Sequence, residues 1–93
     1  MVRVTLRPLG AWQMIVGAET RQIETNGDTV KDLLETLDKM FLGKLKNEIF
    51  TREGHLDPRF KIYVNGVSCD SLGMKTLLAH GDIIVLFSVI DGG

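Results

Sequence analysis

The sequence predicts an α+β protein, a roll in which one main helix packs across a mixed sheet of about four to five strands. Segments near both ends of the chain alternate apolar and polar residues, as strands with one buried face do. One amphipathic segment of about 13 residues separates the predicted strands into two groups. No repeat, linker or low-complexity segment divides the 93 residues, so a single domain is expected.

The composition excludes several classes of protein. With 44% hydrophobic residues the chain can form a core, and its net charge of −1 argues against a nucleic-acid binder, which needs an excess of Lys and Arg. The single cysteine, Cys69, provides neither an internal disulfide nor a four-cysteine metal site. No apolar run approaches the roughly 20 residues that cross a bilayer, so a cytoplasmic protein is expected.

The first strand is predicted over residues 2–7, where apolar side chains alternate with Arg and Thr. Its apolar members are Val2, Val4 and Leu6. Pro8 should end it, because proline has no N–H to donate to a neighbouring strand. Residues 11–16 then follow the spacing of a short helical turn that Gly17 stops, although a strand over 14–16 also fits so short a run.

The main helix is predicted after a second strand over residues 20–25 and the turn pair Asn26-Gly27. Asp28 or Thr29 can cap its first turn. Its apolar stripe, which repeats about every 3.6 residues, consists of Val30, Leu33, Leu34, Leu37, Met40 and Phe41. Gly43 is its expected end.

Residues 44–59 are more polar and predict at most a second short helix. The apolar residues of that helix are Leu45, Ile49 and Phe50. Alternation returns over 60–64, and Asn65-Gly66 predicts a hairpin into a short strand over 67–69.

The most apolar segment is Ile83–Ile90, which follows a turn at residues 80–82. Seven of its eight residues are apolar, which fits either a central strand covered on both faces or a strand whose second face meets a partner. The first and last strands are the most apolar, so we expect them side by side and parallel at the centre of the sheet.

Residue types typical of catalytic sites are sparse. His55 and His80 have no Cys, His or carboxylate partner at metal-ligand spacing, so both are expected at the surface. Cys69 has no nearby histidine to activate its thiol and is interpreted as structural. We therefore expect no catalytic residue, no metal and no bound cofactor, and interpret the chain as a protein that is not itself an enzyme.

Ten glycines occur in the chain, and eight of them lie near predicted turns or element ends. The other two, Gly92 and Gly93, follow the last apolar strand. If residues 88–93 extend, they reach roughly 20 Å beyond it, and residues without Cβ atoms can enter a narrow channel. The ionised carboxylate of Gly93 can attack the α-phosphate of ATP to form an acyl-adenylate, which a sulfur or amine nucleophile then displaces.

Three segments resemble those of the β-grasp sulfur carriers, the small subunit of molybdopterin synthase and its thiamine-pathway relative (MoaD/ThiS). They are Phe87-Ser88-Val89-Ile90-Asp91-Gly92-Gly93, the preceding Gly81-Asp82-Ile83-Ile84-Val85, and Tyr63-Val64-Asn65-Gly66. The segment over 77–82, which leads into the last strand, also matches the family, whereas residues 42–59 do not. The resemblance implies a ubiquitin-like β-grasp domain over residues 1–87 and a flexible tail over 88–93.

The resemblance also implies a carrier cycle. A ubiquitin-activating-type enzyme using ATP and Mg²⁺ would adenylate Gly93, and a sulfur donor such as a cysteine desulfurase system would convert it to a thiocarboxylate. The sulfur would pass to the large subunit of molybdopterin synthase or to another acceptor, with no role for nucleic acid or membrane. Gly92 and Asp91 would present the tail. The residues contacting the partner would be Phe87, Val89 and Ile90.

Several alternatives remain open from the sequence. Ser88-Val89 stands where synthase subunits often carry two prolines, so the pathway could be molybdenum or tungsten cofactor synthesis, thiamine synthesis, tRNA thiolation or conjugation to a lysine amine. A non-covalent β-grasp interaction module is the alternative from another class. Phe87 fits core packing and partner contact equally well. Because no Lys or Arg follows Lys75, the tail region is anionic and predicts a basic channel in the partner.

Overall fold

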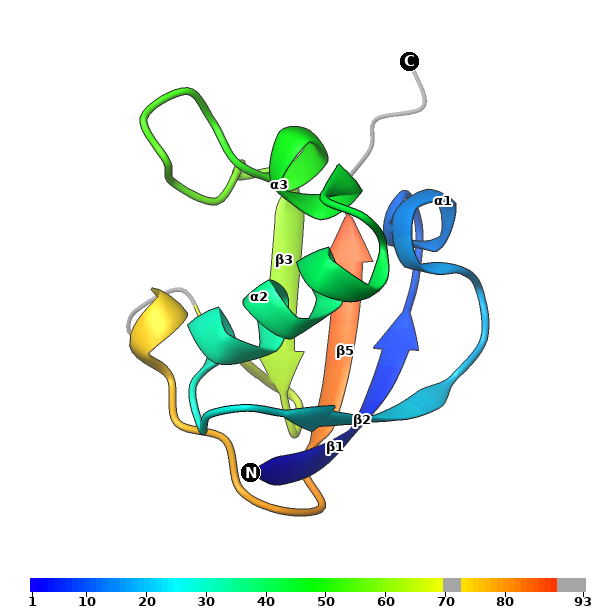
Figure 1. Cartoon of the computed structure of the whole chain (residues 1–93), viewed down its shortest axis with the longest axis vertical. Helices are drawn as coiled ribbons and strands as arrows, with labels where there is room; N and C mark the ends of the chain where they lie inside the picture. The colour runs from blue at the N-terminus through cyan, green and yellow to red at the C-terminus, as the bar shows by residue number, and fades with distance from the viewer. Residues whose placement is uncertain (70–72, 89–93) are drawn as a thin grey trace.

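The computed structural model describes residues 1–69 and 73–88, and its elements follow the predicted order (Figure 1). The strands are β1 (Val2–Pro8), β2 (Arg21–Thr25), β3 (Phe60–Val64), β4 (Val67–Ser68) and β5 (Ile83–Ser88). The helices are α1 (Trp12–Val16), α2 (Val30–Met40), α3 (Lys44–Ile49) and the short 3₁₀ helix η1 (Gly73–Lys75). Residues 14–16 are therefore helical, and the alternative strand there is wrong.

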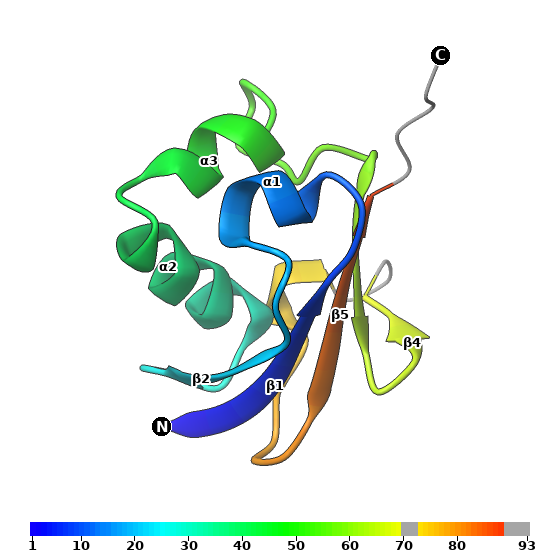
Figure 2. The ribbon, with the colours of Figure 1, turned by 90° about the vertical axis from the view of Figure 1, so that its right-hand side faces the viewer.

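The five strands form one mixed sheet in the order β2-β1-β5-β3-β4. β1 and β5 pair in parallel, with Thr5 opposite Ile83, and the other neighbouring strands pair antiparallel. The predicted parallel pair at the centre of the sheet is thus confirmed. Helices α1, α2 and α3 all lie on the same side of the sheet (Figure 2). The predicted β-grasp roll, with one main helix across a five-stranded sheet, is confirmed.

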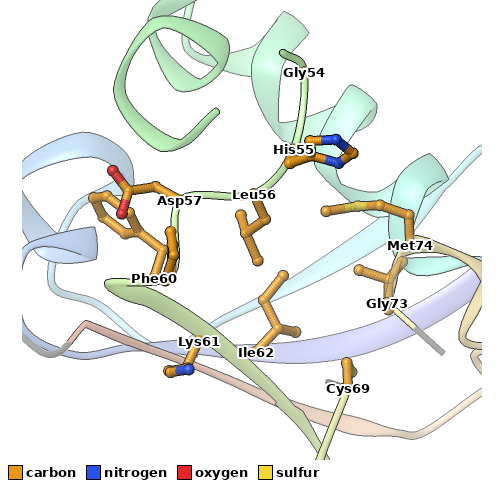
Figure 3. A pocket seen from close by; sticks show the side chains of 12 residues that line it. Gly54, His55, Leu56, Asp57, Phe60, Lys61, Ile62, Cys69, Gly73 and Met74 are labelled. Atoms are coloured by element: carbon orange, nitrogen blue, oxygen red, sulfur yellow. The ribbon is translucent and has the colours of Figure 1, made fainter. Parts of the chain in front are cut away.

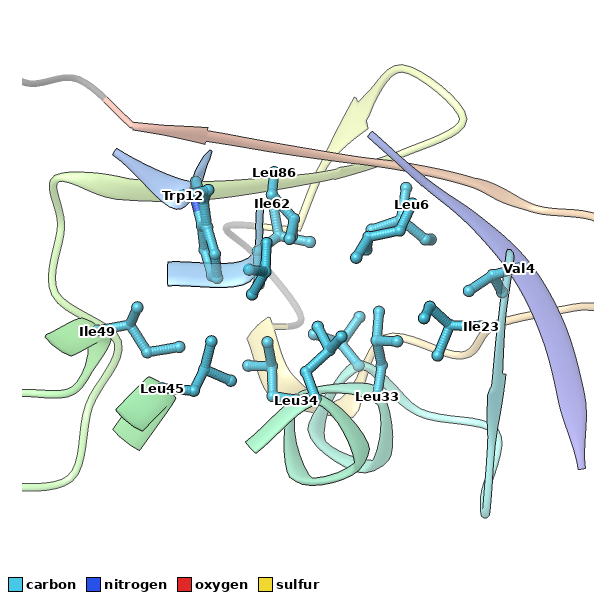
Figure 4. Close-up of a cluster of buried hydrophobic side chains, with 14 of the residues drawn as sticks. Val4, Leu6, Trp12, Ile23, Leu33, Leu34, Leu45, Ile49, Ile62 and Leu86 are labelled. Atoms are coloured by element: carbon cyan, nitrogen blue, oxygen red, sulfur yellow. The ribbon is translucent and has the colours of Figure 1, made fainter. Parts of the chain in front are cut away.

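The core lies between these helices and the sheet (Figure 4). The inward positions of β1 and β5 meet the apolar stripe of α2 there, because strand side chains alternate between faces while helix side chains return about every 3.6 residues. The fully buried residues include Leu6, Leu33, Leu37, Leu45, Ile84 and Leu86. Burying each such side chain contributes roughly 1.5–3 kcal/mol.

The end of α2 differs from the prediction. The helix ends at Met40 rather than at Gly43, because the backbone turns to positive φ at Leu42 and Gly43. Gly43, with φ of 83°, instead precedes α3. Met40 lies at the edge of the apolar stripe in the last helical position, and it is 46% exposed rather than part of the core.

At its start, α2 is capped by Thr29 and not by Asp28. The hydroxyl of Thr29 accepts from the N–H of Asp32 at 3.2 Å, and the Asp32 carboxylate accepts from the N–H of Thr29 at 3.2 Å. This reciprocal capping box satisfies two N–H groups that the first turn leaves without helical partners.

Candidate functional site

Strand β5 carries the chain from the centre of the sheet to the root of the predicted tail. Ser88, predicted as the first residue of the tail, is instead the last residue of this strand and is only 5% exposed. Of the six predicted site residues, Phe87 is described by the structure and the other five lie outside the described residues. They are Val89, Ile90, Asp91, Gly92 and Gly93. The described part of the candidate site is therefore β5 together with the residues that hold its two ends.

The beginning of β5 is held by Asn65, in the hairpin turn between β3 and β4. The Asn65 side-chain amide donates to Oδ1 of Asp82 at 2.8 Å, and its Oδ1 accepts from the N–H of Ile83 at 2.8 Å. Asn65 adopts φ of 52°, a left-handed conformation that asparagine tolerates better than most residues. Two of the segments that carried the family resemblance, 63–66 and 81–85, thus contact each other directly.

The outward face of β5 carries an apolar row, which we call the outer stripe: Ile83, Val85 and Phe87. Ile83 is 45% exposed and Phe87 38% exposed, while the alternate residues of β5 point into the core. The alternative in which β5 is covered on both faces is therefore wrong for the described part of the chain. Phe87 lies at the surface rather than in the core, and its contact with a partner stays a prediction.

Basic side chains flank the outer stripe on both sides. Arg7 of β1 lies opposite Val85, and Lys61 of β3 lies opposite Phe87. Tyr63 lies beside Val85 on the other side. Sequence reasoning missed this basic border, because its residues come from strands that only the pairing brings next to β5. Arg7 and Lys61 alternate with core residues along their strands, and this alternation could have shown that both side chains face outward.

The same sheet face carries an ion pair near its other end. Nη2 of Arg3 lies 2.7 Å from Oε1 of Glu24, its cross-strand neighbour. The hydrogen bond and the charge of Arg3 lower the pKa of Glu24 from its ordinary value of 4.5. Both side chains are about half exposed, so water screens this pair and its contribution to stability is small.

The end of β5 is held by the residues that follow β1, Leu9–Trp12. The indole N–H of Trp12 donates to the carbonyl oxygen of Phe87 at 3.0 Å, and the N–H of Ala11 donates to Oγ of Ser88 at 2.6 Å. Sequence reasoning assigned Trp12 only to a helical turn. No local pattern predicts its contact with a residue 75 positions away.

The residues considered for catalysis are dispersed. His55 and His80 are both exposed, as predicted, and Nδ1 of His80 accepts from the N–H of Arg3 at 3.3 Å. Cys69 is buried at the edge of a cavity of about 410 Å³ that is also lined by Leu56, Ile62 and Met74 (Figure 3). Within residues 1–69 and 73–88, no three His, Cys, Asp or Glu side chains form a candidate metal site. In the same part of the chain, no helix has the length and apolar character needed to span a membrane.

Comparison with known proteins places these features in context. The sequence profile of the ThiS family matches residues 10–93. A search of curated protein sequences finds no match.

Solved structures with a similar fold include SAMP1 from Haloferax volcanii, at 24% identity and a TM-score of 0.79 over 98% of this chain and 99% of that one. CysO, in the BexX/CysO complex of Amycolatopsis orientalis, gives 22% identity and a TM-score of 0.77 over 97% and 99%. A putative molybdopterin converting factor subunit 1 from Pyrococcus furiosus gives 24% and 0.72 over 97% and 100%.

Proposed function

The chain belongs to the ThiS family, and from this we propose that it is a ubiquitin-like sulfur carrier that acts through the carboxyl group of Gly93. The observation that supports the proposal most is the arrangement of β5. Its outward side chains form the outer stripe, and its last residue, Ser88, leads directly into the five tail residues. A partner that covers the outer stripe therefore also meets the root of the tail.

The charges around β5 predict the polarity and charge of the partner's docking surface. Arg7 and Lys61 border the apolar outer stripe, so the docking surface of the partner has an apolar centre with acidic residues beside it. The tail itself carries Asp91 and the carboxylate of Gly93, and it calls for a basic channel. The partner therefore needs acidic residues beside the outer stripe and basic residues along the channel for the tail. Because the two parts of the interface carry opposite charges, the carrier can dock in only one orientation.

The tail then delivers its carboxylate to chemistry that the partner performs. Five residues span at most about 17 Å, and Gly92 and Gly93 have no side chains to obstruct a narrow channel. With ATP and Mg²⁺ bound to the partner, a carboxylate oxygen of Gly93 attacks the α-phosphorus and pyrophosphate leaves. A sulfur nucleophile at the oxidation level of sulfide then attacks the acyl carbon, AMP leaves, and Gly93 becomes a thiocarboxylate.

We propose molybdopterin as the product that receives this sulfur, through the large subunit of a molybdopterin synthase. The similar fold of a Pyrococcus furiosus protein named as a putative molybdopterin converting factor subunit supports this assignment. A second candidate uses the same activated carboxyl group, which a lysine amine can attack to form an isopeptide bond. The similar fold of SAMP1, a protein named as a small archaeal modifier, favours it.

Intact-mass measurement tests the carrier function. The protein is incubated with an activating enzyme from its own organism, ATP, Mg²⁺ and a sulfide source. The expected result is a mass gain equal to the replacement of one oxygen by sulfur, which hydrolysis reverses. A variant lacking Gly93 is the matched control and gains no mass. If the wild-type chain forms neither an adenylate nor a thiocarboxylate, the proposal is wrong.

The two fates of the carboxyl group leave different products in a cell extract. A conjugate carries the chain on a lysine of another protein. Because Lys75 is the last Lys or Arg of the sequence, trypsin leaves residues 76–93 attached to that lysine. Detection of this remnant supports the modifier, whereas a thiocarboxylate that restores molybdopterin synthesis with a synthase large subunit supports the cofactor pathway.

A further inference from the structure

The segment Leu9–Trp12 takes over the support of β5 where β1 stops. The N–H of Leu9, directly after Pro8, donates to the carbonyl oxygen of Leu86 at 2.7 Å. The N–H of Ala11 and the indole N–H of Trp12 then donate to Ser88 and Phe87, as described above. Three donors from four consecutive residues thus hold the last three residues of β5. We call Leu9–Trp12 the root clamp.

Gly10 and Ser88 fit each other closely within the root clamp. Gly10 adopts φ of +64°, and a Cβ atom at this position would collide with the hydroxyl oxygen of Ser88. Ser88 is almost fully buried, so its hydroxyl is held against the Gly10–Ala11 backbone instead of facing water. A glycine is required here both for its backbone conformation and for the space it leaves.

Trp12 is itself fixed from the other side of β5. Its side chain is fully buried, and its ring meets the Phe60 ring edge to face, with centroids 5.3 Å apart and planes at 83°. Phe60 lies opposite Ser88 in the β3–β5 pair. The indole therefore joins the root clamp to β3, so the strand end that leads to the tail is held from both neighbouring sides.

We propose that the root clamp sets the point from which the tail leaves the fold, and that Trp12 and Ser88 are positioning residues for the presentation of Gly93. The inference rests on the proposed carrier function. A fixed root limits the directions in which the five tail residues can start, so less conformational freedom is lost when they enter the channel of a docked partner. Without the root clamp, the last residues of β5 fray and more docked complexes have the tail outside the channel.

The test separates docking from tail presentation. The outer stripe can contact the partner whether or not the tail is inserted, so loss of the root clamp is expected to lower kcat of the adenylation reaction rather than raise its KM. ATP–pyrophosphate exchange is measured with the activating enzyme for Trp12→Phe, which removes the N–H donor, and for Ser88→Ala, which removes the Oγ acceptor. For both variants kcat is expected to fall about tenfold, with KM within about twofold of the wild-type value.

A control variant accounts for general loss of stability. Ile23→Val shortens a buried side chain on the edge strand β2. Ile23 pairs with Val4 and lies at the opposite end of the core from Trp12 (Figure 4). This variant is expected to lower the free energy of unfolding without changing kcat. If Trp12→Phe and Ser88→Ala remain folded and retain wild-type kcat, or if Ile23→Val lowers kcat equally, the positioning role is overturned.

A second measurement needs no partner and keeps the two proposals distinguishable. Trp12 is the only tryptophan, so its indole N–H gives a single NMR signal. Slow exchange of this proton and of the Ala11 amide is expected in the wild type, with faster exchange of the Ala11 amide in Ser88→Ala. Exchange of both protons at the rate of exposed loop amides would overturn the root clamp. Failure of the wild type to be adenylated, with both protons protected, would overturn only the carrier function.

Discussion

Asn65 and Asp82 are joined side chain to side chain at 2.8 Å, and the other arm of the Asn65 amide accepts from the backbone of Ile83. Asp82 in turn accepts from the N–H of Ala79 at 2.8 Å. The turn after β3 and the turn before β5 are therefore one connected unit at the start of the strand that leads to the tail. This unit lies at the end of β5 opposite the root clamp (Figure 1).

Replacement of Asn65 tests this unit. Asn65→Ala removes both side-chain hydrogen bonds and places alanine at a positive φ, so it should lower the free energy of unfolding by roughly 2 kcal/mol. Urea denaturation measures the change. Asn65→Gly is the matched variant, because it loses the same hydrogen bonds but adopts the left-handed conformation freely and should lose less. Equal losses in the two variants would show that the backbone conformation contributes nothing.

Truncation of Phe87 tests the outer stripe. Because the side chain is exposed at the sheet surface, Phe87→Ala should change the stability by less than about 1 kcal/mol. Loss of an aromatic contact at a docking surface should raise KM for the activating enzyme about tenfold, with kcat little changed. Met14→Ala is the control, since Met14 is 89% exposed but lies on α1, across the sheet from the outer stripe. An equal effect of both variants would exclude a specific role for this sheet face.

Removal of the helix cap tests the start of α2. Thr29→Ala deletes the hydroxyl that accepts from Asp32 and should cost about 1 kcal/mol of stability, measured by thermal or urea unfolding. Asp28→Ala should cost much less, because Asp28 does not form the cap. The opposite order of the two losses would mean that Asp28 caps the helix in solution.

The Arg3–Glu24 pair predicts a small dependence of stability on pH. Because Arg3 lowers the pKa of Glu24 in the folded state, the pair stabilises the fold above the ordinary value of 4.5 and loses this effect as the pH falls through the lowered value. The difference in unfolding free energy between wild type and Glu24→Gln should therefore be larger at pH 7 than at acidic pH. Glu19→Gln serves as the control. A difference that does not shrink on acidification, or one that Glu19→Gln reproduces, would contradict the assignment.

Local patterns predicted most of the elements. These patterns depend only on residues a few positions apart in the sequence, so they can be recognised without knowledge of the tertiary structure. They are the alternation in β1 and β3, the apolar stripe of α2 and the turn pair Asn65-Gly66. The end of α2 was predicted too far along the chain, because the backbone already adopts a positive φ at Leu42, one residue before Gly43. Thr29 and Asp28 were both acceptable caps, and only the backbone geometry distinguished them.

The glycine pair at residues 92–93 and the apolar run before it predict a functional C-terminal segment from the sequence alone, because a strand and the segment that follows it are adjacent in the chain; the role of Gly93 stays a prediction. Which face of β5 stays open, which charges border it and how its end is held were decided by tertiary structure. Asn65 meets Asp82 across 17 positions and Trp12 meets Phe87 across 75. Such contacts depend on strand order and register, which arise when the whole sheet packs against its helices and which no single segment encodes.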